Sequence, residues 1–524
     1  VPMSVSIDSQ VEIVSVRYEA DGSPVGASAT ASNGFAHDLV VPTNTPGGSS
    51  IVLSAVALDA SGVEVGRSET TLSIVTPAAV RGTGVSGDTG TLEATDTSLD
   101  GQSLAVYGEL AISGSHSFSS LIVQPESVIV PRRRPDGGPV GIDITVTGDL
   151  YVAYRGVISA GRVGYEGGHQ GHNAGSAVGL TYPGLQGSTD GAGGSHGGRG
   201  NIGIGGPGGP VFGSVRTPGT AGAGGGANGA NPGGSGGGLV RLEVVGRLIV
   251  DGEIWAEGEG GTRGGCGAGG SVLVEATRIE GTGYLAVLGG TPWLGAGARG
   301  DAGGGRIALH GELSAEAPGL WVASGSQWFD SGAPGTGFLK QAGDLHGHLA
   351  IDSWPSEQPA ITELPAVGSG SVSFAQGRTI RGSSTSWVPG IEDVLVEVRR
   401  GSEYVGRFRI ESLDLASQTL TLEQDADGQV AVGDVYQGVR LFDSVTITGR
   451  TRMTTADVVE GRLLVDETAG FESSNTSIPP VDSSPTIAME VSATTVKPGS
   501  SLSVTTHAQD GQGLSLLVVR LDIA

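Results

Sequence analysis

The sequence contains very few of the residues that cross-link small secreted domains or fill large cores. Its 524 residues include one cysteine and three methionines, and aromatic residues make up only 5% of the chain. Because Cys266 has no second cysteine to pair with, an internal disulfide is excluded, and stability must come from strand pairing and burial. We interpret Cys266 as a small residue of a glycine-rich run.

Basic residues and long hydrophobic runs are also scarce. The chain has 29 Lys and Arg against 54 Asp and Glu, a formal net charge of −25, which disfavours nucleic acid as a partner and suits a location outside the cell. No stretch approaches the roughly 20 apolar residues of a membrane span, so we expect no membrane insertion by this segment. The chain begins at Val1 without the basic and apolar regions of a secretion signal, and we expect a fragment of a longer parent protein.

Glycine is abundant, with 95 residues in the chain. Many of them lie between residues 165 and 238, a stretch that cannot pack a core alone because it has few side chains to bury. Large residues such as Tyr165, Tyr182 and Phe212 nevertheless interrupt it. We interpret the stretch as an ordered insertion in which glycine lets backbones lie side by side, as polyproline-II segments do. A mobile surface loop is the alternative.

Short strands rich in Val, Ile and Leu form an internal repeat around this insertion. The clearest copies open at glycine pairs near residues 237, 269 and 304 and recur at a period of roughly 30 to 35 residues. One copy cannot enclose a core, whereas stacked copies can. The sequence therefore predicts an all-β protein in which residues 95–367 form a parallel β-helix, a solenoid that is most simply right-handed. The glycine-rich insertion at 165–238 leaves one corner of it, and a run of separate hairpins is the alternative.

The remaining segments have sequence patterns that are typical of antiparallel β domains. Residues 1–78 alternate apolar and polar positions in short runs, which is typical of an immunoglobulin-like (Ig-like) β-sandwich. Residues 368–444 predict a small β-barrel inserted into the β-helix, which returns at 445–475. Residues 483–524 match the start of a second Ig-like module.

Several of these patterns together resemble a known class of protein. The runs Gly236-Gly-Gly-Leu-Val-Arg-Leu, Gly303-Gly-Gly-Arg-Ile-Ala-Leu and Val432-Gly-Asp-Val-Tyr-Gln-Gly-Val-Arg-Leu-Phe-Asp resemble the glycine-rich β-helix regions of very large bacterial surface or secreted proteins, including Rhs/YD-repeat-associated ones. The resemblance spans about residues 95 to 475. It implies an extracellular or cell-surface location in a bacterium and, as a partner, the rest of a longer chain.

Three histidines of the insertion are the first candidates for chemistry. His169 and His172 occur as His-Gln-Gly-His, and His196 follows in the same stretch. Imidazoles at such spacing can share a metal ion, but no cysteine or tight set of carboxylates accompanies them. We interpret them as exposed polar residues and predict neither a metal nor a cofactor.

A catalytic β-helix is the second possibility that the sequence raises. Polysaccharide lyases on this fold need a basic residue to take a proton beside carboxylates that hold a cation. The only concentrated basic run is Arg132-Arg-Arg, and no acidic cluster recurs on the repeat period, so a solvated turn is the simpler interpretation. Arg299-Gly-Asp301 matches an integrin-type tripeptide, for which chance is a sufficient explanation in a glycine-rich chain.

The leading hypothesis is a non-catalytic, extracellular segment that extends or presents a surface, with an adhesive role of the insertion toward a glycan or another cell-surface ligand. We do not expect an enzyme, although a carbohydrate-active enzyme of the polysaccharide-lyase type is the alternative. Anchoring of the insertion to its scaffold is an equal interpretation of the aromatic residues. The candidate binding residues are Tyr165, His169, His172, Tyr182, His196 and Phe212.

Overall fold

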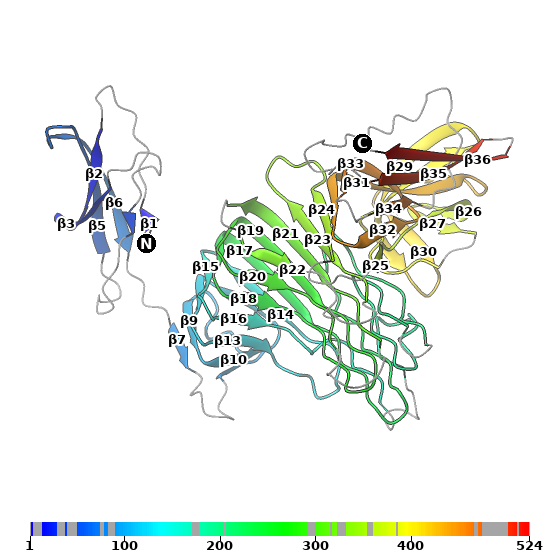
Figure 1. Ribbon diagram of the computed structural model, residues 1–524, viewed down its shortest axis with the longest axis horizontal. Helices are drawn as coiled ribbons and strands as arrows, with labels where there is room; N and C mark the ends of the chain where they lie inside the picture. The colour runs from blue at the N-terminus through cyan, green and yellow to red at the C-terminus, as the bar shows by residue number, and fades with distance from the viewer. Residues whose placement is uncertain are drawn as a thin grey trace. The chain divides into compact units, whose positions relative to one another are not determined.

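The chain is all-β, as predicted: the part that the structure describes contains strands, turns and irregular segments and no helix (Figure 1). Its contacts divide it into two units, Val1–Ala78 and Ala79–Ala524. The computed structural model describes residues 2–3, 13–28, 37–38, 50–73, 78–81, 90–169, 178–202, 206–291, 300–314, 317–321, 332–353, 360–383, 386–465, 470–473, 501–510 and 513–522.

The first unit contains a four-stranded antiparallel sheet in the order β3-β2-β5-β6. Asp21 and Gly22, between β2 and β3, both have positive φ, which the favoured two-residue hairpin turns require. Val16 and Tyr18 are buried on one face. The strands are β1 (Pro2–Met3), β2 (Ser15–Ala20), β3 (Ser23–Ser28), β4 (His37–Asp38), β5 (Ser50–Leu58) and β6 (Glu64–Ser73), with β1 paired to β4. The Ig-like sandwich stays a prediction, because these strands make one sheet and one short pair.

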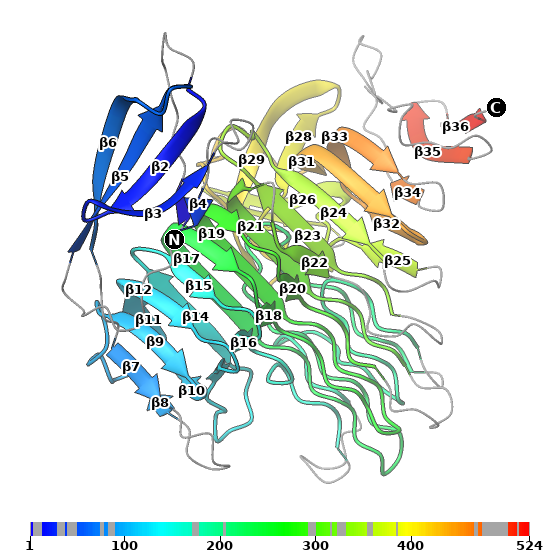
Figure 2. The ribbon, with the colours of Figure 1, turned by 60° about the vertical axis from the view of Figure 1, so that its left-hand side comes forward.

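The second unit begins with parallel strands that alternate between two sheets (Figure 2). The first sheet contains β8 (Gly90–Leu92), β10 (Glu109–Ile112), β13 (Val128–Pro131), β16 (Val157–Ser159), β18 (Glu253–Trp255), β20 (Tyr284–Ala286) and β22 (Gly319–Trp321). Strands of the second are β7 (Ala78–Arg81), β9 (Ser103–Tyr107), β11 (Ser115–Phe118), β12 (Ser120–Val123), β14 (Gly141–Val146), β15 (Leu150–Val152), β17 (Leu239–Val250), β19 (Ser271–Glu280), β21 (Arg306–Leu313) and β23 (Thr336–Lys340).

The repeat seen in the sequence sets the register of these parallel strands. Leu239 pairs with Ser271, Ser271 with Arg306, and Arg306 with Thr336, so each copy lies beside the next. β17 pairs through its first half with β14 and through its second half with β15, and its register shifts between Val244 and Arg247. The strand therefore turns a corner of the sheet. Alternate side chains along β14 and β17 are buried, as one inward face requires.

Six antiparallel strands close into a ring after the parallel region. The pairings run β26–β27–β30–β29–β28–β31 and return from β31 to β26. Trp387, Tyr436 and aliphatic side chains fill one core inside it. The strands are β26 (Ser369–Gln376), β27 (Thr379–Gly382), β28 (Leu395–Arg400), β29 (Glu403–Asp414), β30 (Thr419–Leu422) and β31 (Val435–Thr448).

Parallel pairing resumes beside the ring. The second half of β31 lies between β24 and β33, and β32 lies between β25 and β34, in both cases with parallel partners. β35 and β36 form an antiparallel hairpin in the region predicted to start a second Ig-like module. These strands are β24 (His348–Asp352), β25 (Ala360–Glu363), β32 (Thr451–Thr455), β33 (Val458–Val465), β34 (Gly470–Ser473), β35 (Ser501–Asp510) and β36 (Gly513–Asp522).

Candidate functional site

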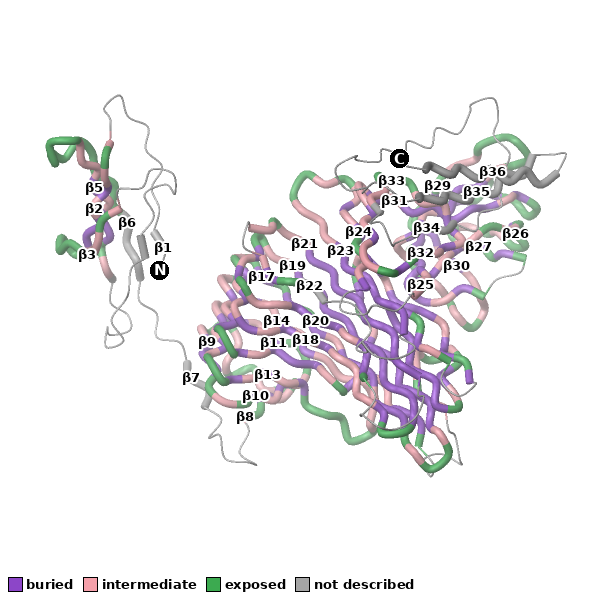
Figure 3. The backbone as a smooth tube through the Cα atoms, viewed as in Figure 1, coloured by how far each residue is buried: buried purple, intermediate pink, exposed green. Residues whose placement is uncertain are grey.

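The glycine-rich insertion packs with other glycine-rich segments into what we call the glycine lattice: residues 160–169, 178–202, 206–238, 256–270, 287–291, 300–305 and 332–335. Figure 2 shows these segments running side by side away from the strands, and Figure 3 shows that most of them are buried. They are joined by backbone hydrogen bonds rather than by regular strand ladders. Backbone hydrogen bonds therefore connect the described parts of the insertion to their neighbouring segments.

The segment at 264–270 shows how the lattice is built. Its amides point toward three different neighbouring segments, and the same neighbour recurs at every third residue. The hydrogen bonds, of 2.7 to 3.0 Å, are Gly265 N to Gly226 O and Ala268 N to Ala223 O, Cys266 N to Gly300 O and Gly269 N to Gly303 O, and Gly267 N to Glu259 O and Gly270 N to Ala256 O. A period of three is the period of the polyproline-II helix. The segment at 264–270 thus bonds to neighbours in three directions, whereas a β-strand bonds to at most one neighbour on either side.

This packing explains both the glycine content and the lone cysteine. A Cβ atom built on Gly265 would overlap the carbonyl oxygen of Ala192, and one on Gly225 would overlap that of Gly265. Cys266 occupies a position that accepts a small side chain, and it is fully buried. Burial raises the pKa of its thiol to about 12, so Cys266 is a packing residue and not a reactive thiol.

The structure brings three of the predicted site residues together. The rings of Tyr182 and Phe212 have centroids 6.0 Å apart, and those of His196 and Phe212 are 5.0 Å apart. Tyr165 and Tyr182 are half-buried and His169 is exposed, whereas Phe212 and His196 are completely buried. His172 lies outside the described residues. Of the five candidates that the structure describes, Tyr165, His169 and Tyr182 therefore have surface to offer a ligand.

The interpretation of His196 as an exposed polar residue is wrong, because the lattice encloses it. Its Nδ1 donates to Gly269 O at 2.8 Å, and its Nε2 lies 2.9 Å from the hydroxyl of Thr220. Burial, with the nearby charge of Arg306, lowers the pKa of His196 to about 3. The neutral ring therefore joins two segments of the lattice. The carbonyl that decides its position lies 73 residues away, which no sequence pattern reveals.

Arg306 is a buried cation that the sequence did not single out. It starts β21, is fully buried, and donates from Nε to Phe212 O at 3.0 Å and from Nη1 to Thr336 Oγ1 at 2.9 Å. Burial, with repulsion from Arg440, lowers the pKa of the guanidinium to about 9. Arg306 thus attaches the insertion to the parallel sheet.

A polar cavity of about 280 Å³ lies where the end of the insertion meets the parallel strands and the ring. The loop at 214–216 is clamped beside it by Asp393, whose Oδ2 accepts hydrogen bonds from the hydroxyl of Ser214 and the amides of Val215 and Arg216 at 2.7 to 3.0 Å. Titratable side chains of both signs line the cavity: Arg216, His310, Lys340, Glu392, Asp393 and Arg409.

Two of these side chains, Arg216 and Glu392, are charged groups in partly buried positions. The Arg216 guanidinium lies 5.0 Å from the centroid of the Phe338 ring and 5.1 Å from that of Phe442, and it donates to two backbone carbonyls. Burial raises the pKa of Glu392, although the amide of Gly390 donates to its carboxylate at 2.7 Å. A carboxyl group with a raised pKa keeps its proton to a higher pH than usual, as a general acid requires. Because the cavity gathers residues from distant parts of the chain, no local motif marks it.

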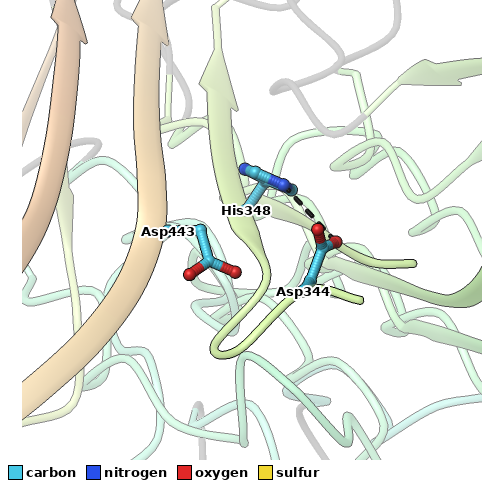
Figure 4. A group of neighbouring side chains, drawn as sticks. All are labelled: Asp344, His348 and Asp443. Carbon is cyan, nitrogen blue, oxygen red and sulfur yellow. Dashed lines mark ion pairs between the residues drawn. The ribbon is translucent and has the colours of Figure 1, made fainter. Parts of the chain in front are cut away.

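A second group of side chains lies near this cavity. One ligand atom each from Asp344, His348 and Asp443 lies within 4.8 Å of the others, and Figure 4 shows the three residues. The sequence Asp344-Leu-His-Gly-His348 places a carboxylate and an imidazole four residues apart, which is a local signal of metal ligands. Asp443 is distant in sequence and joins them only through the pairing of β24 with β31.

Arg133 and Arg134 of the basic run 132–134 line a separate cavity of about 290 Å³, together with Arg162. Arg134 donates from two nitrogens to the carboxylate of Asp136, and Arg133 donates to the carbonyl of Arg162 at 3.2 Å. The three arginines of the run are exposed. This is the solvated turn that the sequence predicts, and its charge is partly neutralised. Asp301 of the Arg-Gly-Asp tripeptide is fully buried and is not displayed on a loop.

Comparisons of the sequence with protein families and curated proteins, and of the fold with solved structures, found no match. The described part of the chain contains no helix that is long and apolar enough to cross a membrane.

Proposed function

We propose that this chain is a non-catalytic, extracellular segment of a large bacterial surface or secreted protein, and that it holds the tips of its glycine-rich insertion rigidly in place for contact with a glycan or another cell-surface ligand. The observation that carries the proposal is the glycine lattice. Loops that bind are most effective when a rigid scaffold positions them, because less ordering entropy is lost on binding. A lattice bonded in three directions supplies such rigidity without a large hydrophobic core.

The same proposal assigns the parallel region to a β-helix. The chain returns in turn to the first sheet and to the two halves of the bent second sheet, and register pairs join each copy to the next. The glycine-rich segments connect the first sheet back to the second, as the remaining side of each coil. Stacked copies of this kind extend a chain in one direction, which suits a presenting stalk.

Exposed apolar side chains on the insertion support its adhesive part. Leu180 is 53% exposed and Ile202 is 61% exposed, although both belong to segments that the lattice orders. Tyr182 lies close to Leu180 in sequence and is half-buried. Rigidly held apolar groups of this kind suit the faces of sugar rings or a protein surface.

The experiment is binding of the chain to bacterial and host cells and to a glycan array, before and after substitution of the exposed side chains. Removing the whole insertion is a poor test, because Gly226 and Ala223 accept hydrogen bonds from the 264–270 segment. The variant Leu180→Ser/Ile202→Ser keeps these bonds, and Val432→Ser, at an exposed valine of the ring, is its control. Loss of binding in the double variant alone would support adhesion. No binding by the unmodified chain would overturn it and leave a passive spacer.

The cavity that Arg216 lines supports a second candidate function, that of a carbohydrate-active enzyme of the polysaccharide-lyase type. Glu392, with its raised pKa, shares the cavity with Lys340 and His310, which supply candidates for proton transfer. Release of unsaturated products from acidic polysaccharides, abolished by Glu392→Gln, would establish this function. Absence of turnover across a panel of such polysaccharides would favour the non-catalytic proposal.

A further inference from the structure

Three metal-ligating side chains converge from separate points of the chain beside the ring. Asp344 lies in the turn between β23 and β24, His348 is the first residue of β24, and Asp443 lies in β31 (Figure 4). The Nε2 atom of His348 is 3.4 Å from Oδ2 of Asp344. All three side chains are partly exposed, so an ion from solvent can reach them.

The imidazole is oriented by a residue outside the group. Nδ1 of His348 lies 2.8 Å from the hydroxyl oxygen of Ser444, its partner in the pairing of β24 with β31. When Nδ1–H donates to this hydroxyl, Nε2 is left with its lone pair on the side of the carboxylates. A hydrogen bond from the second ring nitrogen is the usual way in which a metal-binding histidine is oriented.

The two carboxylates are also held in place. Oδ2 of Asp344 accepts from Gln341 N at 2.7 Å, and Oδ2 of Asp443 accepts from His346 N at 2.9 Å and Gly347 N at 2.8 Å. Among the described residues, no hydrogen bond goes to Oδ1 of either aspartate. One oxygen of each side chain is therefore fixed by the backbone while the other is available. The register of β31 against β33 shifts between Leu441 and Ser444, so Asp443 lies within an irregularity of the strand.

The charge of the group favours a cation. Burial works against ionisation of Asp443, but the amides of His346 and Gly347 outweigh it and lower the pKa of this carboxyl group. In the part of the chain that the structure describes, neither carboxylate forms an ion pair with lysine or arginine. Two neighbouring carboxylates without a lysine or arginine partner repel each other, and a divalent ion between them would relieve this repulsion.

We propose that Asp344, His348 and Asp443 bind a divalent transition-metal ion of the zinc type. One imidazole nitrogen and two carboxylate oxygens suit zinc and its first-row neighbours, whereas calcium and magnesium take oxygen ligands. Three protein ligands leave a further position for water. This site is independent of the adhesive function proposed above.

The ion would join two parts of the second unit. The β23–β24 turn belongs to the end of the first parallel region, and β31 is shared by the ring and the strands that follow it. An ion that binds the folded chain but not the unfolded chain raises the free energy of unfolding. Once the ion concentration exceeds the dissociation constant, this gain grows with the logarithm of the concentration. The metal therefore acts as a cross-link between segments about 100 residues apart.

The test is calorimetric titration of tag-free, chelator-treated chain with Zn²⁺, together with thermal unfolding. We expect one ion per chain and a raised unfolding midpoint, and His348→Ala should weaken binding at least about 10-fold. Asp344→Asn serves as a second variant that keeps the acceptor for Gln341 N. His169→Ala, in the insertion, is the matched control and should bind as the unmodified chain does.

Substitution with cobalt(II) gives a spectroscopic signal of metal binding that a change in the stability of the chain does not produce. Visible absorption bands of bound Co²⁺ should be present in the unmodified chain and in His169→Ala and lost in His348→Ala. The proposal is overturned if the unmodified chain binds no Zn²⁺, if His348→Ala binds it as tightly as the unmodified chain, or if His169→Ala is the variant that loses it. The last outcome would place the ion in the glycine-rich insertion instead.

Discussion

Arg440 donates from Nε to Oδ2 of Asp457 at 3.2 Å, and the two side chains are 1% and 0% exposed. The other oxygen of Asp457 accepts hydrogen bonds from the amides of Val367 and Gly368 at 2.9 and 2.8 Å, where the chain enters the ring. A buried ion pair with satisfied oxygens thus joins the entry of the ring to β31. Such a pair adds little net stability but makes the loss of one partner costly.

Removing the charge of Asp457 should therefore destabilise the second unit strongly. Asp457→Asn keeps the shape but leaves the Arg440 guanidinium buried without a counter-charge, and we expect a loss of about 3 to 5 kcal/mol in the free energy of unfolding, measured by urea denaturation. Asp136→Asn, which breaks the exposed pair with Arg134, is the control and should leave that free energy nearly unchanged. Equal effects of the two substitutions would contradict this account of Arg440.

Acidification should destabilise the chain through His196. Its pKa of about 3 in the folded chain lies below the value near 6.5 of an unfolded histidine, so below about pH 6.5 the unfolded chain takes up a proton that the folded chain does not. This contribution favours unfolding increasingly as the pH falls from about 6.5 toward 3. For one proton the slope is about 1.4 kcal/mol per pH unit, measured by urea denaturation between about pH 6 and 4.

The variant His196→Asn isolates this proton, because the asparagine amide can still donate to Gly269 O in place of Nδ1. We expect it to be less stable at pH 7 but to lose less stability on acidification, by about one proton's slope. His169→Ala, at an exposed histidine, should keep the original slope. An unchanged slope in His196→Asn would show that another group carries the pH dependence.

Even one added methyl group at the centre of the glycine lattice should lower the stability of the chain. In Gly265→Ala the new Cβ meets the carbonyl oxygen of Ala192, which belongs to a segment bonded on several sides and cannot retreat. We expect a loss of about 1 to 3 kcal/mol or more in the free energy of unfolding. Gly219→Ala lies in the same glycine lattice, where the nearest atom to a new Cβ is Thr217 O at 3.8 Å, and it should be tolerated. Thermal unfolding of the two variants compares them directly.

Hydrogen exchange of backbone amides should show that Asp393 holds the end of the insertion in place. Asp393→Ala leaves the amides of Val215 and Arg216 without their acceptor, so hydrogen exchange at 214–217 should accelerate. Exchange in β14 and β17, whose amides pair within the sheet, should change much less. If exchange rose equally in those strands, the aspartate would support the whole unit and not the end of the insertion alone.

The sequence by itself determined the class of fold and the register of the parallel strands. Alternating Val, Ile and Leu after glycine pairs predict strands at β17, β19 and β21, because alternation buries one face whatever the neighbours are. The glycine run likewise predicts close backbone packing, since residues without a Cβ can approach on every side. These are local properties, and the structure contains both the strands and the packing.

Tertiary structure alone decided which side chains meet. His196 is buried because the glycine lattice encloses it, and Gly269 O accepts its hydrogen bond there. The ring closes only when β31 returns to β26, and Asp443 approaches His348 only through the pairing of β24 with β31. Each of these contacts joins residues more than 60 positions apart. The entropic cost of closing a loop changes only slowly with its length, so many distant partners are similarly accessible to a segment. The local sequence therefore does not show which of them it will contact.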